Sequence, residues 1–178
     1  PSGNTFIEVL SWQAYRPEYY FAPDTLTMPM QRILPADWHR WLKIEGKFGD
    51  DNWIYLSDFM LESGRANGRI TLSNWDPSRA PINNCFICIA GYRSGDLRLR
   101  LDKSGSTMVV GMNVWGTWEF RSYDRSMVIR GYEGTRKFTT GRVWLEDAEL
   151  HIARDCMLSE DITFQTTDSH AIIDIPTQ

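Results

Sequence analysis

The residues best suited to acid–base chemistry lie near the C-terminal end of the sequence, at Asp168, Ser169, His170 and Asp174. An imidazole has an ordinary pKa of about 6.5, so His170 can exchange a proton near neutral pH. Asp168 lies two residues earlier, and positions i and i+2 of a strand point to the same face. Its carboxylate can therefore orient the imidazole or hold a substrate hydroxyl. Asp174 is a second candidate for that role, and Ser169 is a candidate hydrogen-bond donor to a substrate.

The same cluster has a purely structural interpretation. Asp and Ser side chains often bond to neighbouring backbone groups at tight corners. Asp168, Ser169 and His170 would then form a polar corner that caps its own backbone.

The elements that must position this cluster are short β-steps separated by Gly, Asn, Asp and Ser, from about residue 82 onward. Three segments align and a fourth begins in the same way: LRLDKSGSTMVVGMN (99–113), WEFRSYDRSMVIRGY (118–132), VWLEDAELHIARD (143–155) and ITFQTTDSH (162–170). With Leu101, Phe120, Leu145 and Phe164 taken as equivalent, and likewise Met108, Met127 and Leu150, most steps are close to 19 residues. Such a period predicts an all-β fold, with a left-handed parallel β-helix over residues 81–178. An antiparallel sandwich is the alternative, and the alternating run LRLRL (97–101) fits it well.

Residues 1–80 carry no such repeat and are expected to form a strand-rich, Trp-rich N-terminal cap. Strands are expected at 38–49, 51–63 and 68–75. A cap is physically required because the terminal coil of a β-helix is otherwise an open sheet edge. The aromatic residues of this region could also form a platform that stacks on sugar rings, although core packing is their commoner role.

The segment RDCMLSEDITFQTTDSHAIID (154–174) resembles the active-site coil of hexapeptide-repeat acyltransferases, especially the O-acetyltransferases that modify bacterial surface polysaccharides. The match is dense over these residues, looser over 82–153, and absent over 1–80. Ala153 and Arg130 stand where the family's hexads usually have glycine. The resemblance implies that His170 is the general base, with Asp168 beside it, and that Ser169 and Asp174 contact the substrate.

The resemblance also implies a reaction and its partners. Acetyl-CoA would be the co-substrate, a saccharide hydroxyl the acceptor, and a homotrimer the assembly, with the acetyl-CoA arm along later coils between subunits. The sequence stops eight residues after His170, so we expect a chain truncated after its active-site coil. Self-association through the open last coil is a further expectation.

Composition limits the other classes of function. The net charge of −4 argues against a nucleic-acid partner. No apolar run is long enough for a membrane span, and no signal peptide is visible. Three cysteines without a signal peptide favour a cytoplasmic location. Cys85 and Cys88 form a CxxC in an apolar run with no second CxxC, so we expect buried thiols and no metal site.

A non-catalytic function remains the alternative. The β-helix would then be a scaffold or a module that binds a glycan or a protein, either as a fragment of an enzyme or as a degenerate relative. The early stop and the eight tryptophans favour this alternative, whereas the 154–174 segment favours the acyltransferase.

Overall fold

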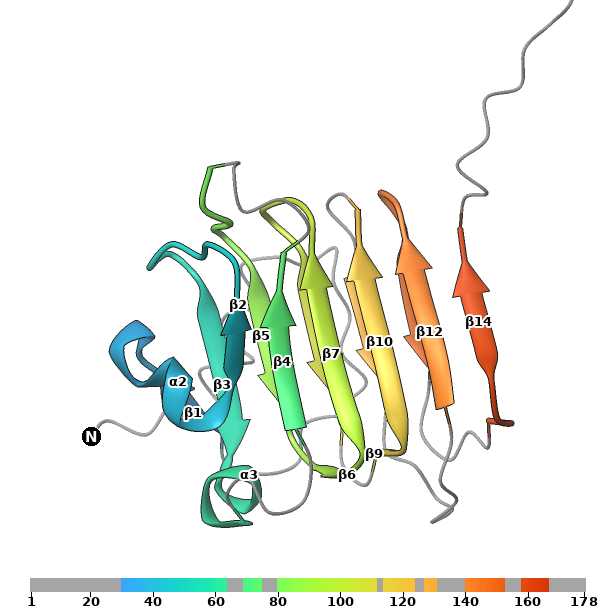
Figure 1. The fold of residues 1–178 in the computed structure, drawn as a ribbon, viewed down its shortest axis with the longest axis horizontal. Helices are drawn as coiled ribbons and strands as arrows, with labels where there is room; N and C mark the ends of the chain where they lie inside the picture. The colour runs from blue at the N-terminus through green and yellow to red at the C-terminus, as the bar shows by residue number, and fades with distance from the viewer. Residues whose placement is uncertain are drawn as a thin grey trace, which may run out of the picture.

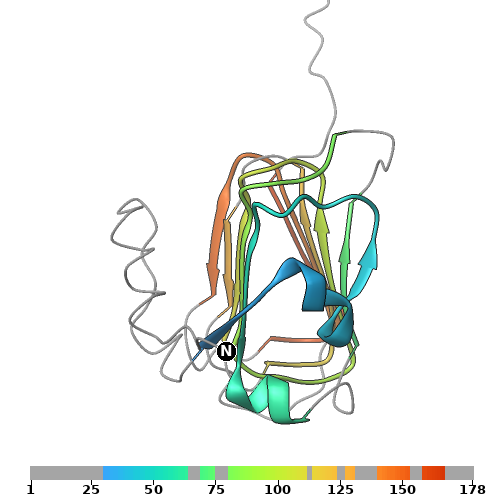
Figure 2. The ribbon, with the colours of Figure 1, turned by 90° about the vertical axis from the view of Figure 1, so that its left-hand side faces the viewer.

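The computed structural model describes residues 30–63, 69–74, 80–111, 114–123, 127–130, 140–152 and 158–166. Within these residues, two six-stranded sheets lie face to face (Figure 1 and Figure 2). Sheet 1 consists of β1 (Met30–Ile33), β3 (Trp53–Ser57), β5 (Phe86–Ile89), β8 (Thr107–Val110), β11 (Met127–Arg130) and β13 (Glu149–Ile152). Sheet 2 consists of β2 (Lys43–Glu45), β4 (Arg69–Ser73), β7 (Asp96–Leu101), β10 (Thr117–Ser122), β12 (Thr140–Leu145) and β14 (Ile162–Gln165).

Long strands alternate between the two sheets along the chain from β2 to β14. We call one passage through both sheets a coil. Each strand pairs in parallel with its equivalent in the next coil, and the described exception is the antiparallel pair β1–β3. A short pair, β6 (Tyr92–Ser94) and β9 (Val114–Trp115), joins two coils at the lower corner (Figure 1). The described part of the chain is therefore strand-rich with parallel sheets, as expected for an all-β fold, and the antiparallel sandwich is wrong.

The pairing register corrects the repeat assigned from the sequence. Phe120 pairs with Leu99 and Val143, whereas Leu101 and Leu145 both pair with Ser122. Strand side chains alternate with a period of two, so a register shift of two residues leaves the same residues facing inward. Aligning the segments by their apolar pattern therefore does not detect it. Leu97, Trp118, Gly141 and Ile162 are the true equivalents in sheet 2, with steps of 21, 23 and 21 residues.

The register of sheet 1 was misassigned in a similar way. Val128 is the partner of both Met108 and Leu150, whereas Met127 pairs with Thr107 and Glu149. The expected equivalence of Met127 with Met108 is therefore wrong by one residue, which on a strand exchanges the two faces.

The space between the sheets is filled by inward-facing apolar side chains. Trp118 and Phe120 are both fully buried, and their rings stack with centroids 5.9 Å apart. Gly141, on the neighbouring strand, is close enough to Trp118 that a β-carbon there would overlap the indole ring. Inside the same core, the hydroxyl groups of Ser106 and Ser122 bond to each other at 2.5 Å.

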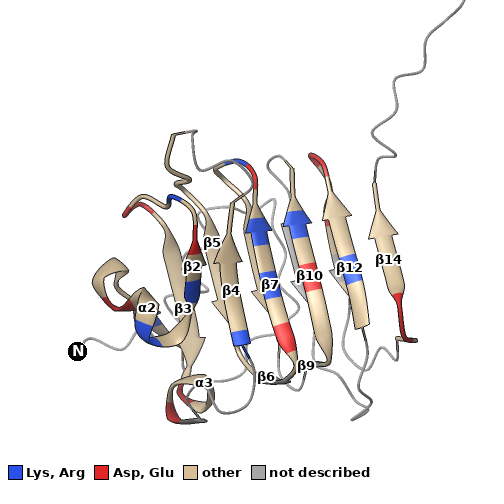
Figure 3. Cartoon of the chain, viewed as in Figure 1, with Lys and Arg blue, Asp and Glu red and all other residues tan. Residues whose placement is uncertain are grey.

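The two sheets differ on their outer faces. The described strands β5 and β8 are buried at every position, which fits their continuous apolar sequences. In contrast, β7 alternates between exposed or half-buried charged residues and buried leucines. The outer face of sheet 2 therefore carries most of the charge that is visible in the front of the molecule (Figure 3).

The N-terminal region differs in detail from its expected strands. Residues expected as strands form the helical turns α2 (Trp38–Trp41), which follows the 3-10 turn η1 (Pro35–Asp37), and α3 (Asp58–Ser63). The α2 turn lies at the open end of the coils, where its Trp38 indole N–H donates to the carbonyl of Ile33 at 2.9 Å (Figure 1). Both sheets continue without a break across residue 80, since β3 pairs with β5 and β4 with β7.

None of the described helices is long and apolar enough to cross a membrane. No group of three or more His, Cys, Asp or Glu side chains in the described residues is arranged to hold a metal ion.

Candidate functional site

The residues predicted to carry the chemistry, Asp168, Ser169, His170 and Asp174, lie outside the described residues. Of the 154–174 segment, the structure describes residues 158–166, which include β14. The strand β14 pairs in parallel with β12, and the chain leaves it at Gln165, three residues before Asp168.

The start of β14 is fixed to the preceding coil by a reciprocal pair of hydrogen bonds. The Thr140 hydroxyl donates to a carboxylate oxygen of Asp161 at 2.6 Å, and the Asp161 backbone N–H donates to the same hydroxyl at 3.0 Å. Asp161 has a φ of 54°, a left-handed conformation that Asp tolerates better than most residues. These contacts fix the turn that leads into β14.

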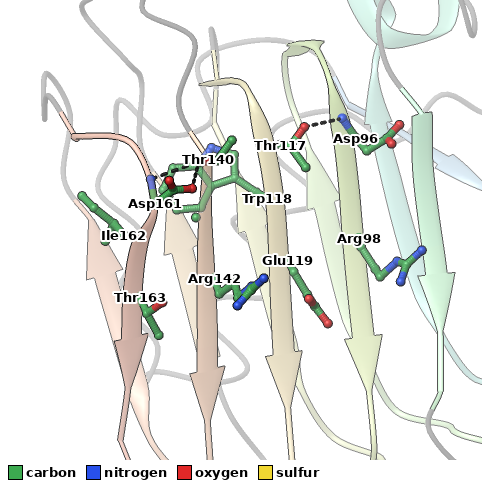
Figure 4. A pocket seen from close by; sticks show the side chains of 11 residues that line it. Asp96, Arg98, Thr117, Trp118, Glu119, Thr140, Arg142, Asp161, Ile162 and Thr163 are labelled. Carbon is green, nitrogen blue, oxygen red and sulfur yellow. Dashed lines mark hydrogen bonds between the residues drawn. The ribbon is translucent and has the colours of Figure 1, made fainter.

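A groove of about 550 Å³ crosses the starting ends of four strands of sheet 2, and we call it the sheet-2 groove (Figure 4). Its volume lies within the usual range of small-molecule sites. It is lined by residues of β7, β10, β12 and β14 and by the turn before β14: Asp96, Arg98, Thr117, Trp118, Glu119, Thr140, Gly141, Arg142, Asp161, Ile162 and Thr163.

The outward-facing lining residues form two rows that run across the strands. In the first row, Asp96, Thr117, Thr140 and Asp161 succeed one another from coil to coil; in the second, Arg98, Glu119, Arg142 and Thr163 do so. Neighbouring members of a row are separated by the strand spacing, about 4.8 Å. The groove therefore offers one polar group per strand in each row.

The two rows differ in how their polar groups are satisfied. In the first row, Thr117 accepts a hydrogen bond of 3.4 Å from the Asp96 backbone N–H, and Thr140 and Asp161 bond each other. In the second row, Arg98, Glu119 and Arg142 form no hydrogen bond or ion pair within the described part of the chain. Glu119 is attracted by the charge of Arg100, and Arg98 by that of Glu45, without forming an ion pair. The charged ends of this row therefore remain open to a ligand.

Farther along the same strands, the charged groups are engaged with one another. The Arg121 guanidinium donates to Asp102 at 3.0 Å and lies over the Tyr123 ring, 3.9 Å from its centroid. Arg100 lies 3.6 Å from the same carboxylate. Burial, and then the nearby Arg121 charge, lower the pKa of Arg100. This cluster is a structural ion-pair network on the same sheet, and none of its residues lines the sheet-2 groove.

A second pocket of about 560 Å³ lies beside the edge strand β2. It is lined by His39, Trp41, Leu42, Lys43, Ile44, Arg69 and Ile70. Lys43 is paired with Glu45 at 2.5 Å, and Arg69 lies 3.9 Å from Asp96. Because its cations have partners of their own, this pocket offers fewer available polar groups than the sheet-2 groove.

Comparison with known proteins identifies no relative. No protein-family model, curated protein or solved structure matches this chain. The candidate function therefore depends on the residues and geometry of the chain itself.

The prediction of buried thiols is confirmed for Cys85 and Cys88. Cys85 and Cys88 are free thiols with no exposed surface. Burial raises the pKa of Cys85 to about 11 and raises that of Cys88 further. Neither thiol is a nucleophile near neutral pH, because the reactive species is the thiolate.

Sequence reasoning missed the charged row of Arg98, Glu119 and Arg142. The available signal was the strict alternation in LRLRL (97–101) and WEFRS (118–122), which places the charged residues on one face. These three residues are 21 and 23 positions apart, so they can be recognised as neighbours only from the correct strand register. The repeat assigned from the sequence had a different register.

Proposed function

We propose that this chain belongs to an O-acetyltransferase that moves an acetyl group from acetyl-CoA to a saccharide hydroxyl. The observation that carries the proposal is the parallel, in-register pairing of β14 with β12. This pairing makes residues 162–165 part of a stacked coil, as expected for the start of an acyltransferase active-site coil. The described strands thus agree with the resemblance of residues 154–174.

The proposal includes a left-handed parallel β-helix as the fold. It is supported by the strand directions in Figure 1, where sheet 2 strands point upward in front, β3 points downward behind, and successive coils advance to the right. A chain that rises in front, descends behind and advances to the right winds with a left hand. Figure 2 agrees, because sheet 2 rises on its right side while sheet 1 descends on its left.

In the proposed reaction, His170 removes the proton from the attacking saccharide hydroxyl. The oxygen forms a bond to the thioester carbonyl carbon of acetyl-CoA, and the carbon–sulfur bond breaks with the electron pair leaving on sulfur. The imidazolium then returns the proton to the CoA thiolate. Asp168 orients the imidazole, while Ser169 and Asp174 contact the acceptor. Acetyl-CoA supplies the acyl group, and the proposal implies a cytoplasmic reaction and a homotrimeric assembly.

The decisive experiment follows acetyl-CoA consumption and the acetylation of a saccharide panel by mass spectrometry. We expect transfer by the unmodified chain and its loss in His170→Ala, with an unchanged circular dichroism spectrum. The matched control is His151→Ala, a histidine on β13 that should leave transfer unaffected. Transfer that survives His170→Ala would contradict the proposed role of the imidazole.

A second candidate function is a saccharide-binding module without catalysis. It is favoured by the sheet-2 groove, which is built from residues 96–163 and needs none of the residues at 168–174. Calorimetric titration with acetyl-CoA separates the two functions. Binding in the micromolar range supports the enzyme, whereas saccharide binding without any acetyl-CoA binding supports the module.

A further inference from the structure

We propose that the sheet-2 groove binds an uncharged, polyhydroxylated saccharide chain that runs across the strands from β7 to β14. This inference deepens the proposed function by assigning the class and the location of its acceptor, and it rests on that function for the role of acceptor. The saccharide site itself is inferred from the two polar rows of the groove.

The shape of the groove favours an extended ligand over a compact one. Its lining residues come from four consecutive parallel strands and the turn before β14, and each coil contributes one member to each row (Figure 4). Because neighbouring strands are about 4.8 Å apart, the rows repeat their polar groups at a regular interval. A linear chain of repeating units can place a similar group opposite each strand.

The chemistry of the second row favours hydroxyl groups. A guanidinium only donates hydrogen bonds and a carboxylate only accepts them, whereas a hydroxyl does both. Along Arg98, Glu119 and Arg142, the required partner changes from acceptor to donor and back to acceptor. One saccharide chain satisfies all three with the same functional group, and Thr163 extends the row with a hydroxyl of its own.

The balance of charge disfavours ionic polymers. The groove is lined by three carboxylates, Asp96, Glu119 and Asp161, and by two guanidinium groups, Arg98 and Arg142. A polyanion would meet a carboxylate between the two arginines, and a polycation would meet an arginine on each side of Glu119. Like charges at this spacing repel, so an uncharged chain fits the alternating row best.

The charged groups of the second row are available without a large cost. Opposite charges on neighbouring strands contribute little to stability when they pair at a surface. Within the described ranges, Arg98, Glu119 and Arg142 have no ion-pair partner; Glu119 and Arg98 are attracted only at longer range, by Arg100 and Glu45. A ligand therefore need not displace an ion pair. Arg98 and Arg142 are exposed and Glu119 is half-buried, so all three can be reached from solvent.

The test measures saccharide binding by calorimetry in His170→Ala, without acetyl-CoA, so that it is independent of turnover. The ligands are uncharged gluco-, manno- and galacto-hexasaccharides and the anionic hexagalacturonate. We expect at least one uncharged hexasaccharide to bind in the micromolar to millimolar range, and hexagalacturonate to bind at least about tenfold more weakly. Tighter binding of hexagalacturonate, or no binding of any uncharged hexasaccharide, overturns the proposal.

Variants locate the binding on the protein. Glu119→Gln with Arg142→Gln removes two alternating charges and should weaken binding at least about tenfold. Glu62→Gln with Arg40→Gln, on α3 and α2, is the matched control, because it also removes one charge of each sign, and it should bind as the parent does. Unchanged affinity in the double variant, with urea unfolding like that of the parent, overturns the assignment to this groove.

The outcome is distinguishable from failure of the proposed function. If saccharide binding depends on Glu119 and Arg142 but the chain transfers no acetyl group, the groove is a saccharide site and the proposed enzymatic function is wrong. If acetyl transfer occurs and substitution of these two residues does not affect it, the proposed enzymatic function stands and the groove is not its acceptor site.

Discussion

The indole ring of Trp118 occupies the space into which any residue other than glycine at position 141 would direct its β-carbon. Trp118 is fully buried, and its ring also stacks on Phe120. The two residues are neighbours on β10 and β12, 23 positions apart in the sequence. Each of them therefore restricts which residue the other can be.

Gly141→Ala is expected to destabilise the chain by about 1–3 kcal/mol, because the added methyl group overpacks the core against the indole. The free energy of unfolding in urea measures this cost. Trp118→Leu alone should also destabilise, by about 3 kcal/mol, because it leaves a cavity. Combined with Trp118→Leu, Gly141→Ala should cost less than it does alone, and strictly additive costs would show that the two positions do not interact.

Asn52 is expected to be the most sensitive polar residue of the described core. Its side-chain N–H groups donate to the carbonyls of Gly49 and Ile82 at 2.8 and 2.9 Å, and its oxygen accepts from the Cys85 N–H at 3.0 Å. Asn52→Ala leaves the Cys85 N–H and the Gly49 carbonyl without this partner, while the Ile82 carbonyl still accepts from the Gly49 N–H, and it should cost about 3 kcal/mol. Asn83→Ala is the control, because its side-chain bond of 3.3 Å to the Pro81 carbonyl is exposed, and its cost in urea unfolding should stay below about 1 kcal/mol.

Asp102→Asn should destabilise the chain by about 1–3 kcal/mol, because its carboxylate serves two arginines whose side chains are 19% and 14% exposed. The loss should shrink as salt is added, since salt screens the charges that remain. Asp37→Asn is the matched control: its partner Arg40 is 65% exposed, so the cost should be below about 1 kcal/mol. Equal losses in thermal unfolding for the two variants would show that partial burial adds nothing to the pair.

The stability contributed by Cys85 should depend on pH in the alkaline range. Burial raises its pKa to about 11, above the value of about 8.5 in an unfolded chain. The contribution is therefore complete below about pH 8.5 and declines as the pH rises toward 11, because the unfolded chain loses the thiol proton first. The difference in unfolding free energy between the parent and Cys85→Ala should shrink over this range. A difference that stays constant up to pH 11 would mean that the thiol is not protected by burial.

Local sequence patterns predicted the parallel arrangement because apolar residues recur at matching positions in several segments. They failed at the register, since Leu99 and Leu101 are equally good inward residues and only pairing with Phe120 separates them. They also failed at Trp38–Trp41, where an aromatic run resembles a strand. There, Pro35 begins a helical turn and a hydrogen bond from the Trp38 indole to Ile33 holds it, a contact that local propensity does not reveal.

The candidate site was predictable only in part, for a related reason. The His170 cluster is local in sequence and could be proposed from residue types alone. The sheet-2 groove, in contrast, depends on Arg98, Glu119 and Arg142 becoming neighbours, and these residues belong to three different coils. Their adjacency is a property of the stacking, which one strand considered by itself does not contain.

The pairing of Trp118 with Gly141 also means that the coils are not interchangeable units. Backbone pairing between parallel strands would accept the coils in any order, because every strand offers the same N–H and C=O groups. Deletion of the 21 residues from Gly141 to Asp161 would instead bring Ile162 beside the Trp118 ring, where no room exists for its side chain. The order of the coils is therefore fixed by the volumes of their inward side chains. A new coil can be gained or lost only together with compensating changes in its neighbours.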